Sequence, residues 1–207
     1  MYIMKNFGLY VIITSPQLPY KTIAEICVYH RISMLQLREK KLSDRKLIRV
    51  GKQIREITRG TCTNFVINDR PDIAVICEAD YLHLGQDDIP IEEARKIVGN
   101  MKIGLSTHSI KQAKDALSKK PDYIGFGPIY PTNTKAIPDK PVGVDQLKEV
   151  LQFSDVPVVA IGGIDNSNII NVINTGAPNV ALVKYLMQTN DLEKRIIEIK
   201  KLINNKS

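Results

Sequence analysis

The feature that most constrains this chain is the regular alternation of short β-branched runs with amphipathic stretches from one end to the other. Such alternation is typical of repeated βα units built around a parallel sheet. Eight runs are predicted to be strands, and their compact apolar character suits strands that are buried on both faces. They are residues 9–14, 34–38, 65–68, 81–84, 103–106, 123–127, 158–161 and 180–183.

The stretches between these runs carry apolar residues at three- and four-residue spacing, which predicts amphipathic helices, for example over residues 45–59 and 192–202. An open doubly wound sheet can also be built from βα units. Eight units in 207 residues, with no GxGxxG motif after the first strand, favour a closed barrel instead. The predicted fold is an α/β protein, a single (β/α)8 TIM barrel. Because no linker divides the chain, residues 1–207 are expected to form one catalytic domain.

The charge and the apolar runs limit the kinds of partner. A formal net charge of +7 attracts anions. The basic residues are scattered, with no basic stripe interleaved with aromatics, so we expect small phosphorylated substrates and no nucleic acid. No apolar run reaches the roughly 20 residues of a membrane helix, and the first residues do not form a signal-peptide pattern. We therefore expect a cytoplasmic protein without a membrane partner, and the sequence leaves a homodimer open.

The cysteines predict no disulfide framework. Cys27, Cys62 and Cys77 form no CxxC pair, and their number is odd. Free and mostly buried thiols are the expected state.

Polar or glycine-rich segments follow six successive predicted strands. They are QLREK (36–40), NDR (68–70), HLGQDD (83–88), STHS (106–109), GPIYPTNTK (127–135) and IGGI (161–164). The loops that precede the strands carry no comparable set. Because barrel enzymes place their chemistry on the loops that follow the strands, this asymmetry predicts an active site at the carboxyl ends.

Asp69 and Asp88 follow neighbouring predicted strands, so both carboxylates are expected at one mouth. Two such ligands, together with substrate phosphates, can complete the octahedral shell of Mg²⁺. The alternative is that these aspartates cap the next helices, with Asp87 or Asp88 capping a helix that begins near Ile91. Spacing alone leaves both open.

Arg38 and Lys40 stand two residues apart at the end of the second predicted strand, so they face the same side. A guanidinium fork beside an ammonium can hold a pyrophosphate from two directions. The alternative is a solvated strand end in which Glu39 forms salt bridges with its neighbours.

The segment GPIYPTNTK offers hydroxyls of Thr132 and Thr134 and backbone amides that can bind phosphate, while Lys135 can neutralise a leaving group. The alternative is a turn-rich loop whose threonines bond to their own backbone.

Gly162 and Gly163 follow the seventh predicted strand, and Val183 and Lys184 stand at the end of the eighth. Barrels commonly build a phosphate site from these two loops, where glycine lets the amides approach an anion. The two glycines also suit a tight βα turn.

The three histidines carry different expectations. We expect His83 to pack or hydrogen-bond in the barrel wall, and His30 to be a surface residue of a helix. His108 is a candidate general acid or base, with a polar liner or a helix start as the alternative.

Taken in order, QLREK, INDR with a following Asp72, HLGQDD, GLSTHS, DYIGFGPIYPTNTK and VAIGGI resemble the thiamine-phosphate synthase family, from about Leu9 to about Leu186. The resemblance implies a (β/α)8-barrel transferase of thiamine biosynthesis with one Mg²⁺ per active site. Such an enzyme joins a pyrimidine-methyl pyrophosphate to a thiazole phosphate and releases pyrophosphate. It also implies a dissociative mechanism, in which pyrophosphate leaves first and the thiazole nitrogen traps a pyrimidine-methyl cation.

By motif position, the resemblance assigns catalytic roles to Arg38, Lys40, Ser106 and Lys135. The substrate-binding residues that it implies on the pyrimidine side are Gln36, Leu37, Arg38, Glu39, Lys40, Asn68, Ser106 and Lys135. Those on the thiazole phosphate side are Thr132, Asn133, Thr134, Gly163, Val183 and Lys184. Asp69 and Asp88 are assigned to Mg²⁺.

The chain departs from the family pattern at two positions: Lys184 replaces a usual serine, and Arg31 replaces a usual glycine.

Two other functions compete with the synthase. A thiazole tautomerase is a related barrel that uses a histidine at the position of His108, but such proteins tend to lose NDR, QDD and PTNTK, which are intact here. A non-catalytic sensor of a thiamine intermediate would have little need for both cations and a pair of metal ligands. The sequence therefore favours the synthase.

Overall fold

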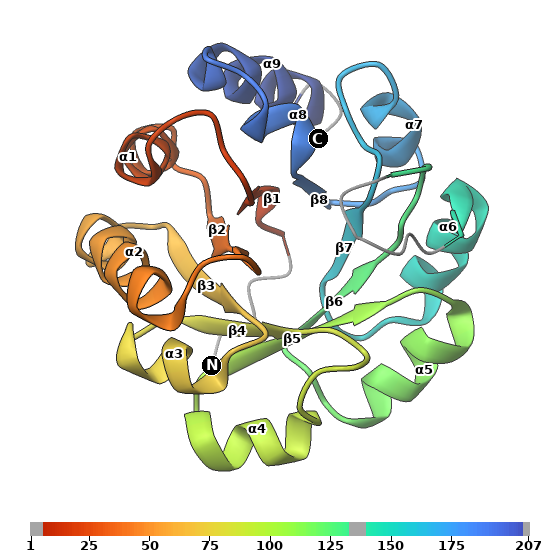
Figure 1. The fold of residues 1–207 in the computed structure, drawn as a ribbon. Helices are drawn as coiled ribbons and strands as arrows, with labels where there is room; N and C mark the ends of the chain where they lie inside the picture. Colours follow the sequence, from red (N-terminus) through yellow and green to blue (C-terminus); the bar gives the residue numbers. More distant parts are fainter. Residues whose placement is uncertain (1–5, 133–139, 205–207) are drawn as a thin grey trace.

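The eight strands of the chain form a closed parallel barrel surrounded by helices (Figure 1). The computed structural model describes residues 6–132 and 140–204. The strands follow one another around the barrel in chain order, and β8 closes the ring by pairing with β1. The predicted (β/α)8 TIM barrel is therefore confirmed.

Each predicted strand is present, with ends that differ from the prediction by at most one residue. The strands are β1 (Gly8–Ile13), β2 (Met34–Leu37), β3 (Asn64–Asn68), β4 (Tyr81–Leu84), β5 (Lys102–Thr107), β6 (Tyr123–Phe126), β7 (Val158–Ile161) and β8 (Asn179–Leu182). The strands could be predicted this closely because helices cover their outer face. Strands that are buried on both faces are continuous apolar runs in the sequence.

The helices lie on the outside of the barrel and bury the apolar faces that the spacing predicted. In α2, for example, Leu47, Val50 and Ile54 are buried. The helices are α1 (Tyr20–Tyr29), α2 (Asp44–Thr58), α3 (Pro71–Ile76), α4 (Ile91–Val98), α5 (Ile110–Ser118), α6 (Gly143–Phe153), α7 (Ile169–Ile173), α8 (Lys184–Met187) and α9 (Leu192–Asn204). Among the described residues, no helix has the length and apolar character needed to cross a membrane.

Alternate residues of each strand face the barrel interior or the helices. In β1, Leu9, Val11 and Ile13 pack outward, whereas Tyr10 and Ile12 belong to an inner cluster. This inner cluster consists of Phe7, Tyr10, Ile12, Met34, Val66, Tyr81, Tyr123, Val159 and Ala181. The barrel is therefore a packed core below its mouth and not a pore.

A glycine in β5 makes room for Tyr123, one of the three tyrosines of the inner cluster. A Cβ at Gly104 would lie 2.0 Å from Cζ of Tyr123. The rings of Tyr10 and Tyr81 meet Tyr123 edge to face, with centroids 6.1 Å and 6.0 Å away. Any larger residue at position 104 would displace this aromatic group.

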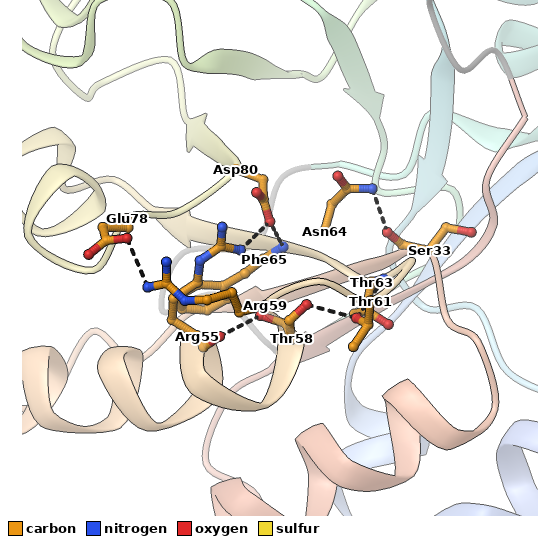
Figure 2. A network of polar contacts seen from close by, with 10 residues as sticks. All are labelled: Ser33, Arg55, Thr58, Arg59, Thr61, Thr63, Asn64, Phe65, Glu78 and Asp80. Carbon is orange, nitrogen blue, oxygen red and sulfur yellow. Dashed lines mark hydrogen bonds and ion pairs between the residues drawn. The ribbon is translucent and has the colours of Figure 1, made fainter.

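A similar polar contact holds the amino ends of β3 and β5, and Figure 2 shows the one at β3. The carboxylate of Asp80, just before β4, accepts hydrogen bonds from the backbone N–H of Phe65 and from Arg55, both at 2.8 Å. Asp122, just before β6, likewise accepts from the N–H of Ile103 at 2.8 Å, with Arg95 3.7 Å away. These carboxylates lie at the opposite end of the barrel from the predicted site, so they serve the fold.

The cysteine prediction is confirmed: Cys27, Cys62 and Cys77 are free, and only Cys62 is exposed. Burial raises the pKa of the Cys27 thiol. His30 ends α1 and is half-buried, because its ring meets Glu193 at the start of α9 at 2.7 Å.

Candidate active site

Three predicted strand-end residues face the interior just above the inner cluster. Gln36, Asn68 and His83 stand two residues after Met34, Val66 and Tyr81, which all belong to that cluster. The two-residue period of a strand therefore turns their side chains toward the same mouth. Gln36 is 1% exposed and Asn68 9%.

A chain of hydrogen bonds crosses the barrel beneath the mouth. Gln36 Nε2 donates to the hydroxyl of Tyr10 at 2.7 Å, and this hydroxyl lies 3.0 Å from that of Tyr123. His83 joins the chain, with Nδ1 2.8 Å from the Tyr123 hydroxyl and Nε2 2.8 Å from Oγ of Ser106. Gln36 and Ser106 are thus held by one polar layer.

Burial raises the pKa of both Tyr10 and Tyr123, so both phenols stay protonated at neutral pH. The prediction that His83 hydrogen-bonds in the barrel wall is confirmed. Sequence reasoning did not find the two tyrosines. The available signal was their place in predicted strands, at positions that face inward.

Asp69 and Asp88 come together at the mouth, where their carboxyl groups share a hydrogen bond. Asp88 Oδ2 also accepts from the backbone N–H of Gly85 at 2.6 Å. Burial, followed by the hydrogen bond with Asp69, raises the pKa of Asp88. Burial opposes ionisation of Asp69 too, but its hydrogen bonds to Asp88 and Lys40 outweigh burial and lower its pKa. Asp69 is therefore the more acidic member of the pair.

The helix-cap interpretation of Asp88 is wrong. Pro90 is the N-cap of α4, and no side chain caps that helix. Asp88 turns instead toward Gly85 and Asp69, because the loop that carries it folds back over the end of β4.

This donor set fits a hydrated divalent cation. Two neighbouring carboxylates offer oxygen ligands of the kind that a hard divalent cation prefers. In the described part of the chain, no cluster of three or more His, Cys, Asp or Glu side chains could enclose a metal. Mg²⁺ usually binds through one or two carboxylates and completes its shell with water and substrate phosphates, so a pair is sufficient.

The two cations of QLREK approach the same carboxylate. Lys40 Nζ lies 2.8 Å from Asp69 Oδ2. Arg38 is half-buried, its charge helps to lower the pKa of Asp69, and its backbone N–H donates to the carbonyl of Ile13 at 2.9 Å. Positive charge is therefore concentrated beside the carboxylate pair.

The alternative interpretation, a solvated strand end in which Glu39 forms salt bridges with its neighbours, is wrong. Its side chain is buried, and its Oε1 accepts from the N–H of Ser15 at 2.7 Å and from the hydroxyl of Tyr20 at 3.0 Å. Leu37 packs in the outer core under the helices. The Leu37 side chain points away from the mouth, and the Glu39 carboxylate is engaged by Ser15 and Tyr20.

The loops after β6 and β7 are pressed together at the other side of the mouth. The backbone N–H groups of Ile129 and Tyr130 donate to the carbonyls of Ile161 and Gly162 at 2.9 Å and 3.0 Å. Gly163 has φ +67°, and a Cβ there would lie 2.7 Å from the carbonyl oxygen of Pro131. The loops can approach this closely only because glycine occupies that position.

The structure describes some of the other residues predicted to bind the thiazole phosphate, but not all of them. Thr132 is half-buried at the end of the first described stretch, and Asn133, Thr134 and Lys135 lie outside the described residues. Val183 packs against the inner cluster, and Lys184 is exposed at the first position of α8.

His108 supports the β6 loop. Its backbone N–H donates to Gln112 at 2.7 Å, and its Nδ1 lies 2.6 Å from the carbonyl oxygen of Gly127. It is not the N-cap of α5, since Ser109 caps that helix by accepting from the N–H of Gln112. The ring is thus held with Nδ1 toward the backbone.

Comparison with known proteins shows which proteins this chain resembles. The sequence pattern of the family described as "Thiamine monophosphate synthase" matches residues 9–186. The chain is 42% identical over 173 residues to the thiamine-phosphate synthase of Lawsonia intracellularis, covering 83% of this chain and 80% of that protein. It is 38% identical over 205 residues to that of Persephonella marina, covering 97% of each.

Two solved structures have the same fold as this chain. The thiamine phosphate pyrophosphorylase from Pyrococcus furiosus superposes with a TM-score of 0.89 at 31% identity, over 99% of this chain and 98% of that one. A 3-hexulose-6-phosphate synthase from Salmonella typhimurium has a TM-score of 0.72 at 13% identity over 97% and 100% of the two chains, and shares the fold alone.

Proposed function

The chain belongs to the thiamine monophosphate synthase family, and from this premise we propose how its own residues form thiamine phosphate. The substrates are 4-amino-2-methyl-5-(diphosphooxymethyl)pyrimidine and 4-methyl-5-(2-phosphooxyethyl)thiazole. The observation that carries the proposal is the gathering of Arg38 and Lys40 around the carboxylates of Asp69 and Asp88 at one mouth. Cations beside a pair of metal ligands suit a leaving pyrophosphate.

Asp69 and Asp88 would hold one Mg²⁺, which neutralises charge on the pyrophosphate when bound. Arg38, Lys40 and Lys135 bind the same group from the protein side. As the bond between the pyrimidine methylene carbon and oxygen breaks, its electron pair leaves with pyrophosphate, and these cations stabilise the growing negative charge.

The pyrimidine-methyl cation that remains is trapped by the thiazole nitrogen, whose lone pair forms the new carbon–nitrogen bond. No protein nucleophile is needed, so positioning accounts for much of the catalysis. Gln36, Asn68 and Ser106 bind the pyrimidine substrate, and the polar layer beneath Gln36 and Ser106 supports fixed orientations for both.

The thiazole phosphate is assigned to the side of the mouth formed by the loops after β6, β7 and β8. Gly163 supports this assignment, because a residue without Cβ lets the loop after β6 pack against the loop after β7 at this side of the mouth. The proposed binding residues are Thr132, Asn133, Thr134, Gly163, Val183 and Lys184. We also propose that residues 1–207 act as one catalytic domain on these small substrates in the cytoplasm.

The test is formation of thiamine phosphate from the two purified substrates, with Mg²⁺ and with the chelator EDTA. We expect product and pyrophosphate in equal amounts with Mg²⁺, and a large loss of rate with EDTA that added Mg²⁺ reverses. A tautomerase or a sensor would not consume the pyrimidine substrate, so absence of product would overturn the proposal. A rate unaffected by EDTA would remove Mg²⁺ from it.

A further inference from the structure

The guanidinium of Arg70 lies between two carboxylates and holds both in a forked arrangement. Its Nε and Nη2 donate to Asp72 at 2.9 Å and 2.6 Å. Its Nη1 and Nη2 donate to Asp44 at 2.7 Å and 3.2 Å. Hydrogen bonds from Arg70 lower the pKa of both aspartates, so both are ionised at neutral pH. Such double forks fix geometry as well as charge.

The two aspartates begin neighbouring helices. Asp44 is the first residue of α2, and Asp72 is the second residue of α3. Arg70 therefore ties together the segments that follow β2 and β3. The first of these segments carries Lys40 and the second carries Asp69, and the two side chains meet at 2.8 Å. The fork is thus a second connection between the same two segments.

The backbone beside Arg70 is unusual. Asp69 has φ +63°, a left-handed backbone conformation that residues with a Cβ rarely adopt. The chain reverses there: the N–H of Asp69 still donates to the carbonyl of His83 in the barrel, while the N–H of Arg70 turns back to the carbonyl of Asn68, both at 2.8 Å. The direction of the Asp69 carboxylate therefore depends on where the next residue is held.

We propose that Arg70 is a positioning residue for divalent-cation binding: its fork to Asp44 and Asp72 holds the reversed chain so that Asp69 faces Asp88. The inference rests on the proposed function, because it takes Asp69 as a metal ligand. Arg70 acts through the backbone and through Asp69, and its side chain is directed to the two helices. Its side chain is 38% exposed, and exposed ion pairs contribute little to the free energy of unfolding. The effect is therefore expected in metal affinity and not in stability.

A matched control lies at the other end of the same two helices. Arg59, which follows α2, donates to Glu78, which lies just beyond α3, at 2.8 Å (Figure 2). This arginine links the same helices through one carboxylate, where Arg70 uses two, and it lies at the amino ends of the strands. Comparing Arg70→Ala with Arg59→Ala separates the position of the arginine from the general effect of losing a helix-to-helix ion pair.

The experiment measures binding of Mn²⁺ alone to the full chain, by electron paramagnetic resonance, for the unaltered protein and for Arg70→Ala, Arg70→Lys, Arg59→Ala and Asp69→Asn. Residues that orient metal ligands typically change metal affinity by about 10-fold or more, so we expect Kd to rise about 10-fold in Arg70→Ala. Arg70→Lys should recover only part of this, because an ammonium cannot fork to two carboxylates. Arg59→Ala should bind Mn²⁺ as the unaltered protein does, with both alanine variants melting at similar temperatures.

A kinetic measurement provides a second readout. Half-saturation by Mg²⁺ should shift upward in Arg70→Ala by the same factor as the Kd for Mn²⁺, while kcat at saturating Mg²⁺ largely recovers. Equal Mn²⁺ affinity in Arg70→Ala and Arg59→Ala overturns the inference. If Arg70→Ala does not fold, Asp44→Asn replaces it, and unaltered Mn²⁺ binding there has the same meaning.

Asp69→Asn distinguishes the two levels of the argument. If it loses Mn²⁺ while the Arg70 variants do not, only the positioning role of Arg70 fails. If Asp69→Asn binds Mn²⁺ normally, the magnesium site fails and this inference with it.

Discussion

The carboxylate of Glu39 accepts a hydrogen bond from the backbone N–H of Ser15 at 2.7 Å, although the sequence places Glu39 between two cations. Ser15 has φ +43°, so Glu39 holds a strained turn after β1 against the end of β2. The same carboxylate accepts from Tyr20, and burial together with the charge of Glu39 raises the pKa of that phenol to about 12. Glu39 thus orients the strand end from which Arg38 and Lys40 project.

Replacing Glu39 should therefore reduce stability. Glu39→Ala removes a charged acceptor of hydrogen bonds from the N–H of Ser15 and the hydroxyl of Tyr20, and hydrogen bonds to charged groups typically contribute about 1.5–3 kcal/mol to the free energy of unfolding. Glu39→Gln keeps an acceptor oxygen and should lose less. Urea denaturation measures both, with Lys41→Ala on the exposed neighbour as a control. A Glu39→Gln variant of normal stability whose KM for the pyrimidine substrate alone rises would instead indicate direct substrate binding.

Asp69→Asn and Asp88→Asn should each reduce turnover and Mg²⁺ dependence by orders of magnitude while the barrel stays folded, because both side chains lie at the mouth and outside the apolar core. Asp87→Asn should do less, since Asp87 is exposed beside the pair. The measurement is initial rate against Mg²⁺ concentration, with circular dichroism as the check on folding. Normal activity in either of the first two variants would remove that residue from the proposed metal site.

Gly163→Ala should damage the thiazole side of the mouth. A Cβ there meets Tyr130 and Pro131 at 2.7 Å and also requires φ +67°. Gly176 is a matched control, because it has φ +90° but nothing within 4 Å of a built Cβ. We expect Gly163→Ala to lose roughly 1–3 kcal/mol more unfolding free energy than Gly176→Ala, and to raise KM for the thiazole phosphate more than for the pyrimidine substrate. Equal losses would show that only backbone strain matters.

Lys184→Ser tests the departure from the family pattern after β8. If the ammonium adds a charge-assisted hydrogen bond to the thiazole phosphate, the serine variant should raise KM for that substrate several-fold and make it less sensitive to salt. KM for the pyrimidine substrate should stay nearly constant. Tighter or equal binding of the thiazole phosphate in Lys184→Ser would leave Lys184 as a solvated side chain.

The buried tyrosines predict a loss of stability in alkali. The pKa of Tyr10 is raised in the folded protein above the value of about 10 that an unfolded chain has. Below pH 10 the folded and unfolded states both keep the proton, so the phenol does not lower the unfolding free energy. Above it the unfolded state releases protons first, so the unfolding free energy falls by up to about 1.4 kcal/mol per pH unit for each such phenol. Urea denaturation at pH 8 to 11 measures the slope, and Tyr10→Phe should make it shallower. An unchanged slope in that variant would contradict the prediction.

Local sequence patterns were enough to predict the fold and the face of the barrel where the candidate site lies. Strand positions were predictable to within one residue because the compact apolar run of a buried parallel strand is a local property. Since all strands of such a barrel point the same way, polar residues at their carboxyl ends had to meet at one mouth. Neither step depends on which side chain contacts which.

The partners of individual side chains, in contrast, could be seen only in the folded chain. Asp88 lies shortly before α4, whose N-cap is Pro90, and its partners are Gly85 and Asp69. The hydroxyls of Tyr10 and Tyr123 meet across 113 positions of sequence. Likewise, Arg70 finds Asp44 from the segment after the preceding strand. The direction of a polar side chain depends on acceptors and donors that folding brings from distant parts of the chain, and no local pattern specifies them.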